Sequence, residues 1–255
     1  MLDIKRIRED FNIFQVMHME SDEVYTHSAI LAELLNPKGS HGCKDIFLQL
    51  FLDLLPTQFE QPFDTTNAKA EVEVVIGDKT EEEGGRMDVL IHSGKQAIII
   101  ENKIYAQDQY NQLSRYETYA KERYPDNYKI IYLTLDQHDP NDESSKKVSY
   151  IPISYSEHII AWLTSCKNIT IDKPLIRETL TQYIQHIKEL TNTIDMDAET
   201  NNELMKILIS NLSATNQIIQ MQGEIEMHVV KKHIIPLLES LGDRYGKEIS
   251  LITNF

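Results

Sequence analysis

Three charged side chains between residues 88 and 103 combine the residue types that bind a divalent cation and act on a phosphate. Asp88 interrupts the apolar run RMDVLI, and Glu101 and Lys103 lie in the run AIIIENKI. Side chains two residues apart on a strand project from the same face, so Glu101 and Lys103 can share one site. Carboxylates are the hard oxygen ligands of divalent cations, and such sites leave positions open for water and phosphate. The pattern therefore predicts a metal site suited to phosphate chemistry.

A simpler interpretation exists for each of these residues alone. Glu101 and Lys103 can form an ordinary ion pair at a strand end, and Asp88 can be a solvated residue at a sheet edge. Taken together, however, two carboxylates that interrupt strongly apolar runs are hard to explain in this way. A buried charge costs several kcal/mol unless a metal or another partner compensates it.

The elements that must position these residues follow from the spacing of apolar side chains. Three β-type runs are separated by the turn-like segments TEEEGG and SGK, which predicts antiparallel pairing. A segment with helical spacing and an almost fully apolar strand come next. The predicted order is strand, strand, strand, helix, strand, over residues 70–78, 86–94, 96–104, 107–124 and 128–136.

Segments of helical spacing flank this core on both sides. Before it we predict helices over 11–17, 26–35 and 44–55. After it, a strand within 148–155 precedes helical segments at 157–165, 174–190, 201–221 and 226–241, and 248–255 resembles the start of a strand. We therefore divide the chain into a core with N-terminal helices, residues 1–155, and a helical C-terminal region, residues 156–255. That region either packs on the core or is truncated.

The bulk composition limits how the chain can bind its partners. A net charge of −15 and a sequence pI near 5.0 argue against a broad basic surface that coats nucleic acid. They still permit a local basic rim around a metal site. Cys43 and Cys166 have no CxxC spacing, and we find neither a signal peptide nor about 18 consecutive apolar residues. We expect a cytoplasmic protein with reduced thiols that does not enter a membrane.

The order of these motifs resembles a known signature. Asp88 followed across a hairpin by Glu101-Asn102-Lys103 resembles the D…ExK signature of the PD-(D/E)XK nucleases. Gln112 and Tyr116 in the next helix resemble the QxxxY motif of the RecB-like branch. The stretches FNIF, HSAILAELLNPKGSHG and ENKIYAQDQYNQLSRY are similar to a bacterial and phage family within this superfamily. The resemblance covers about residues 11–136.

The resemblance implies an α/β, restriction-endonuclease-like fold with an αβββαβ core and a mixed central sheet. It also implies that Asp88, Glu101 and the backbone carbonyl of Asn102 bind Mg²⁺ or Mn²⁺. Lys103 would orient or deprotonate the attacking water and stabilise charge in the transition state. Gln112 and Tyr116 lie on one helix face, where the amide would order Lys103, a water or the phosphate. The alternative for Tyr116 is core packing.

Many members of the superfamily add an acidic residue from the first helix, for which this chain offers Glu23 and Glu33. We prefer Glu23 because it lies four residues before His27, on the same helical face. Glu33 lies within AILAELL, where it can simply face solvent. His27 either contacts a phosphate or the carboxylates, or it is a hydrogen-bonded structural histidine.

The function that we predict is metal-dependent hydrolysis of nucleic-acid phosphodiester bonds, with DNA as the substrate. The family resemblance implies a role in restriction or phage defence. One alternative is a catalytically silent nuclease fold that serves as a binding or assembly module, and another is a nuclease or toxin directed at RNA. The C-terminal helices offer a surface for a homodimer or a protein partner.

Overall fold

The computed structural model describes residues 11–193 apart from 20–21, 57–58, 126 and 146–147. It also describes residues 206, 209–212, 221 and 232. The chain divides into two compact units, Met1–Ile194 and Asp195–Phe255. In the second unit, the described residues are exposed, and 206, 209, 210 and 212 are helical. Most of the predicted segments 201–221 and 226–241, and all of 248–255, lie outside the described residues.

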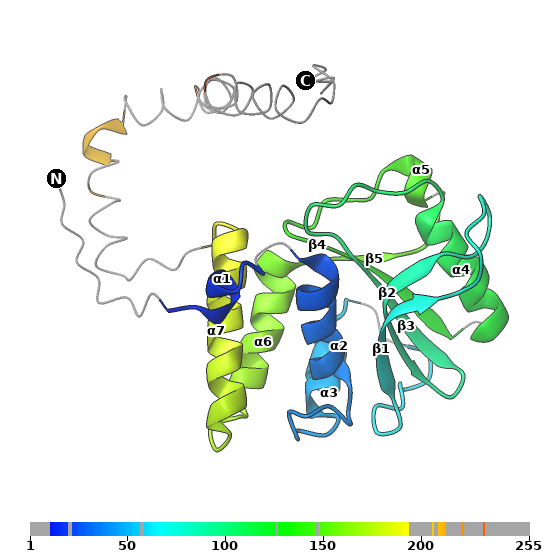
Figure 1. Ribbon diagram of the computed structural model, residues 1–255, viewed down its shortest axis with the longest axis horizontal. Helices are drawn as coiled ribbons and strands as arrows, with labels where there is room; N and C mark the ends of the chain where they lie inside the picture. The colour runs from blue at the N-terminus through cyan, green and yellow to red at the C-terminus, as the bar shows by residue number, and fades with distance from the viewer. Residues whose placement is uncertain are drawn as a thin grey trace. The chain divides into compact units, whose positions relative to one another are not determined.

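The first unit is built on a five-stranded mixed sheet with the order β1-β2-β3-β4-β5 (Figure 1). The first three strands pair in antiparallel fashion, and β4 and β5 each pair in parallel with the strand before them. The bounds are β1 Lys69–Val75, β2 Arg86–Ser93, β3 Gln96–Asn102, β4 Tyr128–Thr134 and β5 Ile151–Ser154. The predicted mixed sheet and αβββαβ order are confirmed.

Helices cover both faces of the sheet. Figure 1 shows α4 and α5 on one side and α2, α3, α6 and α7 on the other. The α-helices are α1 Ile13–Val16, α2 Ala29–Leu35, α3 Ile46–Leu54, α4 Gln112–Arg123, α5 Asp142–Ser145, α6 Ile160–Asn168 and α7 Pro174–Leu190. Two π-helical segments, η1 Glu23–Ser28 and η2 Tyr155–Ile159, run directly into α2 and α6. The sequence did not predict these wider turns, although it predicted helices at both places.

The central strand β3 is buried along its whole length, as its apolar sequence QAIIIEN requires. Its alternate side chains enter two separate cores. Ile98 and Ile100 pack with the core that includes Leu31 and Trp162, whereas Ile99 packs with Leu113 and the other residues of the α4 side. The two-residue turn between β2 and β3 contains Gly94 at φ 56°, a conformation that favours glycine. This tight turn fixes the register of the two strands that carry the candidate site.

The helices predicted over 157–165 and 174–190 are present as η2 with α6 and as α7. They belong to the first compact unit, where the indole Nε1 of Trp162 donates a hydrogen bond of 2.8 Å to the backbone oxygen of Phe47. The compact unit thus ends at Ile194, further along the chain than the boundary predicted at residue 155. Within the part of the chain that the structure describes, no helix has the length and apolar character to span a membrane.

Candidate active site

Asp88 and Glu101 face each other across β2 and β3. The register pairs Val89 with Ile100, and its continuation by one residue sets Asp88 opposite Glu101. The backbone N–H of Asn102 donates a hydrogen bond of 2.7 Å to Oδ2 of Asp88, which fixes one end of this carboxylate. The exposed fraction of Glu101 is only 1%. Two carboxylates therefore meet on rigid strands, on the face of the sheet that α4 covers.

Glu101 is the centre of a hydrogen-bond network that joins four of the predicted residues. Its Oε1 lies 2.6 Å from Nζ of Lys103 and accepts a hydrogen bond of 2.7 Å from Nε2 of Gln112. Its Oε2 lies 2.8 Å from the hydroxyl of Tyr116, which is also 2.7 Å from the backbone oxygen of Arg86. Because a hydroxyl carries one proton, Tyr116 donates to one of these two oxygens at a time. Tyr116 thus both packs in the core and contacts the site.

The geometry of α4 explains why two of these residues reach Glu101 together. Gln112 is the first residue of the helix, and Tyr116 lies one turn later on the same face. Nε2 of Gln112 also donates a hydrogen bond of 3.1 Å to the Tyr116 hydroxyl. The pair therefore acts as one unit that holds both oxygens of the Glu101 carboxylate.

The site carries an excess of negative charge, which the ammonium of Lys103 offsets only in part. Burial and the neighbouring carboxylates of Glu101 and Glu73 raise the pKa of Asp88 to about 8, against the lowering effects of the Asn102 N–H and Lys103. Burial also raises the pKa of Glu101, although Lys103 lowers it. A raised pKa means that the charged form of the carboxyl is disfavoured, and a nearby positive ion stabilises that charged form. The donor set of this site therefore fits a hard divalent cation.

Lys103 remains positively charged in this environment. Burial alone lowers the pKa of its ammonium, but Glu101, Asp88 and Glu23 together raise that pKa above its ordinary value. The side chain is nearly buried, with an exposed fraction of 6%. Charges in such surroundings interact strongly because water screens them poorly.

The structure distinguishes between the two candidates for the additional acidic residue. Oε1 of Glu23, in η1, accepts three backbone N–H groups, from residues 104, 105 and 106, at 2.7, 2.8 and 2.9 Å. Glu23 therefore holds the chain that leaves the site directly after Lys103. Glu33 instead accepts a hydrogen bond from the backbone N–H of Ser40, within its own N-terminal segment.

His27 is completely buried among aromatic rings. Its Nδ1 lies 2.9 Å from the hydroxyl of Tyr183, and its ring contacts those of Tyr155 and His186. This hydrogen bond joins η1 to α7. This environment is that of a hydrogen-bonded structural histidine, which was one of the two interpretations of the sequence.

The sequence analysis missed two features of the site, the role of the Asn102 side chain and the carboxylate of Glu73. The side chain of Asn102 lies on the opposite face of β3 from Glu101, where it donates a hydrogen bond of 3.0 Å to Oγ of Ser28 and accepts one of 2.9 Å from the hydroxyl of Tyr155. A polar residue in an otherwise apolar strand was a signal for this role. Glu73 lies on β1 beside Asp88, and it can be recognised as part of the site only once the register of β1 against β2 is known.

Among the described residues, no group of three or more His, Cys, Asp or Glu side chains is arranged to bind a metal ion. A cation at this site would thus be bound by the two carboxylates of Asp88 and Glu101 with backbone or water oxygens completing the shell. Such a mixed shell is usual for Mg²⁺, which keeps several waters in protein sites.

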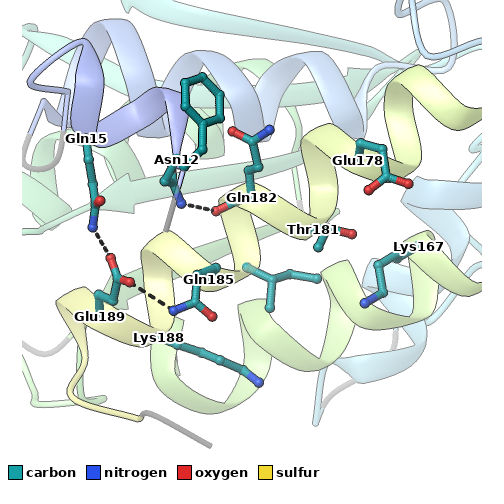
Figure 2. A pocket seen from close by; sticks show the side chains of 11 residues that line it. Asn12, Gln15, Lys167, Glu178, Thr181, Gln182, Gln185, Lys188 and Glu189 are labelled. Atoms are coloured by element: carbon teal, nitrogen blue, oxygen red, sulfur yellow. Dashed lines mark hydrogen bonds between the residues drawn. The ribbon is translucent and has the colours of Figure 1, made fainter. Parts of the chain in front are cut away.

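A separate pocket of about 810 Å³ lies between α1, α6 and α7 (Figure 2). None of the predicted site residues lines it. Its polar groups bond to one another: Nδ2 of Asn12 donates 2.8 Å to the backbone oxygen of Gln182, and Nε2 of Gln185 donates 2.9 Å to Oε1 of Glu189. The first of these bonds joins α1 to α7.

The fold and site together define a restriction-endonuclease-like α/β protein with a carboxylate and lysine centre. A sequence model of the PD-(D/E)XK nuclease superfamily matches residues 11–185. The chain belongs to this superfamily. The match includes α6 and most of α7, which the resemblance seen in the sequence had left out. No curated protein and no solved structure matches the chain.

Proposed function

We propose that this chain is a metal-dependent nuclease that hydrolyses phosphodiester bonds of DNA. The observation that carries the proposal is the meeting of Asp88, Glu101 and Lys103 at one end of the β2–β3 pair, with Glu101 bonded directly to Lys103. Membership of a nuclease superfamily agrees with it. Fold alone would not assign a function, but this set of side chains has a specific chemical use.

The cation of the proposal is Mg²⁺ or Mn²⁺, bound by Asp88, Glu101 and the backbone carbonyl of Asn102. When bound, such an ion polarises a phosphoryl oxygen and lowers the pKa of water. Asp88 and Glu101 contribute rigid oxygen ligands because each lies on a strand that pairs on both sides. Their negative charges repel each other across the two strands, and this repulsion is the source of the affinity for the cation.

The proposed role of Lys103 is to supply a fixed positive charge beside the reacting phosphate. Its raised pKa keeps the ammonium protonated at neutral pH, so it does not readily serve as a base. An ammonium donor orients water and stabilises the negative charge that develops as the phosphate is attacked. This favours the orienting and charge-stabilising roles over proton abstraction.

The remaining residues are proposed to position this centre. Gln112 and Tyr116 hold the Glu101 carboxylate from α4. Glu23 holds the backbone after Lys103 through three hydrogen bonds. Charge-assisted bonds of this kind are shorter and stronger than neutral ones, so they restrict the motion of the groups that must meet the phosphate.

The resemblance to phage and bacterial proteins supports a role in restriction or phage defence in the cytoplasm, and the C-terminal region is proposed as a surface for a homodimer or another partner. One alternative function is favoured by a specific observation. The net charge of −15 suits a protein that binds a partner better than one that binds DNA over a broad surface. A catalytically silent binding module is therefore the second candidate.

The test is incubation of the purified chain with plasmid, linear duplex and single-stranded DNA and with RNA, each with Mg²⁺, Mn²⁺ or EDTA. We expect cleavage of DNA with the metals and none with EDTA. A parallel thermal scan should show that Mn²⁺ raises the melting temperature of the wild type, and does so less for Glu101→Gln, because the ion binds the native state through that carboxylate. Cleavage of RNA alone would replace DNA with RNA as the substrate. A failure to cut any substrate, together with binding of a partner, would support the silent module.

A further inference from the structure

Glu73 continues the row of site carboxylates onto a third strand. The β1–β2 register pairs Val72 with Val89 and Val74 with Met87, so Glu73 lies opposite Asp88. The β2–β3 register in turn sets Asp88 opposite Glu101. Three adjacent strands thus each present a carboxylate at the same level of the sheet.

The backbones of β1 and β2 depart from regular strand geometry at this row of carboxylates. Glu73 has φ 54°, in the left-handed region that residues other than glycine rarely adopt. Regular alternation would send the side chains of Met87 and Val89 to the same face, yet Met87 packs on the α4 side and Val89 on the opposite side. The sheet is therefore distorted around the pair of Glu73 and Asp88. Strained backbone of this kind is concentrated at functional sites.

The two oxygens of Glu73 have different surroundings. Oε2 lies 2.7 Å from Nη1 of Arg86, whose side chain is 58% exposed. Oε1 is buried and, in the described part of the chain, has no hydrogen-bond partner. The negative charge of Glu73 also acts on Asp88, since it is one of the groups that raise the pKa of that carboxyl. A buried acceptor without a donor is costly, so a donor is expected to occupy this position.

We infer that Glu73 is a third carboxylate of the cation site, whose free Oε1 accepts a hydrogen bond from a water that hydrates the ion. Glu73 is thus a positioning residue that acts through water, in line with the lack of a group of three directly ligating side chains among the described residues. Mg²⁺ and Mn²⁺ sites commonly use carboxylates in this way, because hydration waters need acceptors. The inference rests on the proposed metal-dependent function.

The test compares Mn²⁺ binding, by calorimetric titration, in the wild type, Glu73→Gln and Glu71→Gln. Glu71 is a matched control because it lies two residues away on β1, is exposed and pairs with His92 at 3.0 Å. Glu73→Gln should weaken Mn²⁺ binding about 10-fold, the lower end of the range for residues that hold a ligand shell. Glu71→Gln should stay within about 2-fold of the wild type. Glu73→Asp retains the carboxylate and should restore part of the affinity.

Arg86 separates this role from a purely structural one. If the Glu73–Arg86 ion pair only held β1 against β2, Arg86→Gln would weaken Mn²⁺ binding as much as Glu73→Gln does. If Glu73 acts on the ion, Arg86→Gln removes a competing positive charge and should leave the affinity unchanged or raise it. Circular dichroism of each variant checks that the fold is retained, and Glu73→Asp is the variant to rely on if Glu73→Gln does not fold.

The outcomes separate the inference from the proposal beneath it. Mn²⁺ binding by the wild type that is equal in Glu73→Gln and Glu71→Gln overturns the inference alone. Equal losses in Glu73→Gln and Arg86→Gln also overturn it. If the wild type binds no Mn²⁺ at all, the metal-dependent function and the inference both fail.

Discussion

The Nζ atom of Lys103 lies 2.6 Å from Oε1 of Glu101, and both side chains are almost completely buried. This pair joins the residue that is proposed to bind the cation to the residue that is proposed to stabilise the transition state. Without an ion, the ammonium partly neutralises Glu101. A divalent cation bound here would compete with Lys103 for the carboxylate of Glu101, since both are positive charges. Removal of a site carboxylate should therefore weaken binding of the cation, whereas removal of the Lys103 charge should not.

Asp88→Asn should abolish stabilisation by Mn²⁺ and, in EDTA, make the protein more stable than the wild type at alkaline pH. The folded-state pKa of Asp88, about 8, lies above the ordinary value of 3.8, so ionisation costs stability as the pH rises from about 4 to 8. Asparagine has no such cost. Because the side chain is partly accessible to water, we expect a gain of about 1–2 kcal/mol at pH 9 and little gain at pH 4. Thermal scans across this range measure it, with Asp78→Asn as an exposed control. A gain that does not depend on pH would contradict the assignment.

Lys103→Met should leave Mn²⁺ affinity unchanged or slightly higher while cleavage falls by about 100-fold or more. The variant keeps most of the apolar stem but removes the charge that repels the cation and that is needed when the phosphate becomes more negative. Single-turnover cleavage and calorimetry measure the two effects separately. Lys95→Met, at the exposed turn of the same hairpin, is the control and should cut normally. Comparable cleavage by Lys103→Met and the wild type would remove Lys103 from the mechanism.

Tyr116→Phe should weaken Mn²⁺ binding more at pH 6 than at pH 8. The hydrogen bond from Tyr116 lowers the pKa of Glu101, so without it protons compete with the cation up to a higher pH. A loss of about 10-fold in affinity at pH 6 is expected for a residue that orients a ligand. Tyr119→Phe, on the same helix, is the control. If Tyr116→Phe loses no more Mn²⁺ affinity than Tyr119→Phe, and loses as much at pH 8 as at pH 6, Tyr116 acts only in packing.

Glu23→Ala should release the backbone that follows Lys103. Three N–H groups, at residues 104–106, lose their shared acceptor, and the loss of a charged acceptor costs about 1.5–3 kcal/mol. Hydrogen exchange at these amides should accelerate, and cleavage should fall because Lys103 is less well placed. Glu33→Ala removes an acceptor from Ser40 instead and should leave exchange at 104–106 unchanged. Unchanged exchange in Glu23→Ala would show that the loop is held by other contacts.

The periodicity of the sequence was sufficient to predict the sheet and the central pair of the site. Alternation along a strand is a local property, so Glu101 and Lys103 had to share a face wherever β3 was placed. The short SGK turn then limited how far Asp88 could lie from them. Helical spacing likewise placed Gln112 beside Tyr116. These predictions needed only nearby residues, which explains why they agree with the arrangement in the structure.

Packing between distant segments decided the rest. Glu23 and Glu33 lie in one helical region, and only the docking of η1 against the end of β3 brings Glu23 to the backbone after Lys103. The same docking buries His27 against α7, more than 150 residues away in sequence. Glu73 reaches Asp88 only through the β1 register. Local spacing fixes which side chains share a face, whereas tertiary contacts decide which faces meet, because those contacts depend on the summed packing of the whole unit.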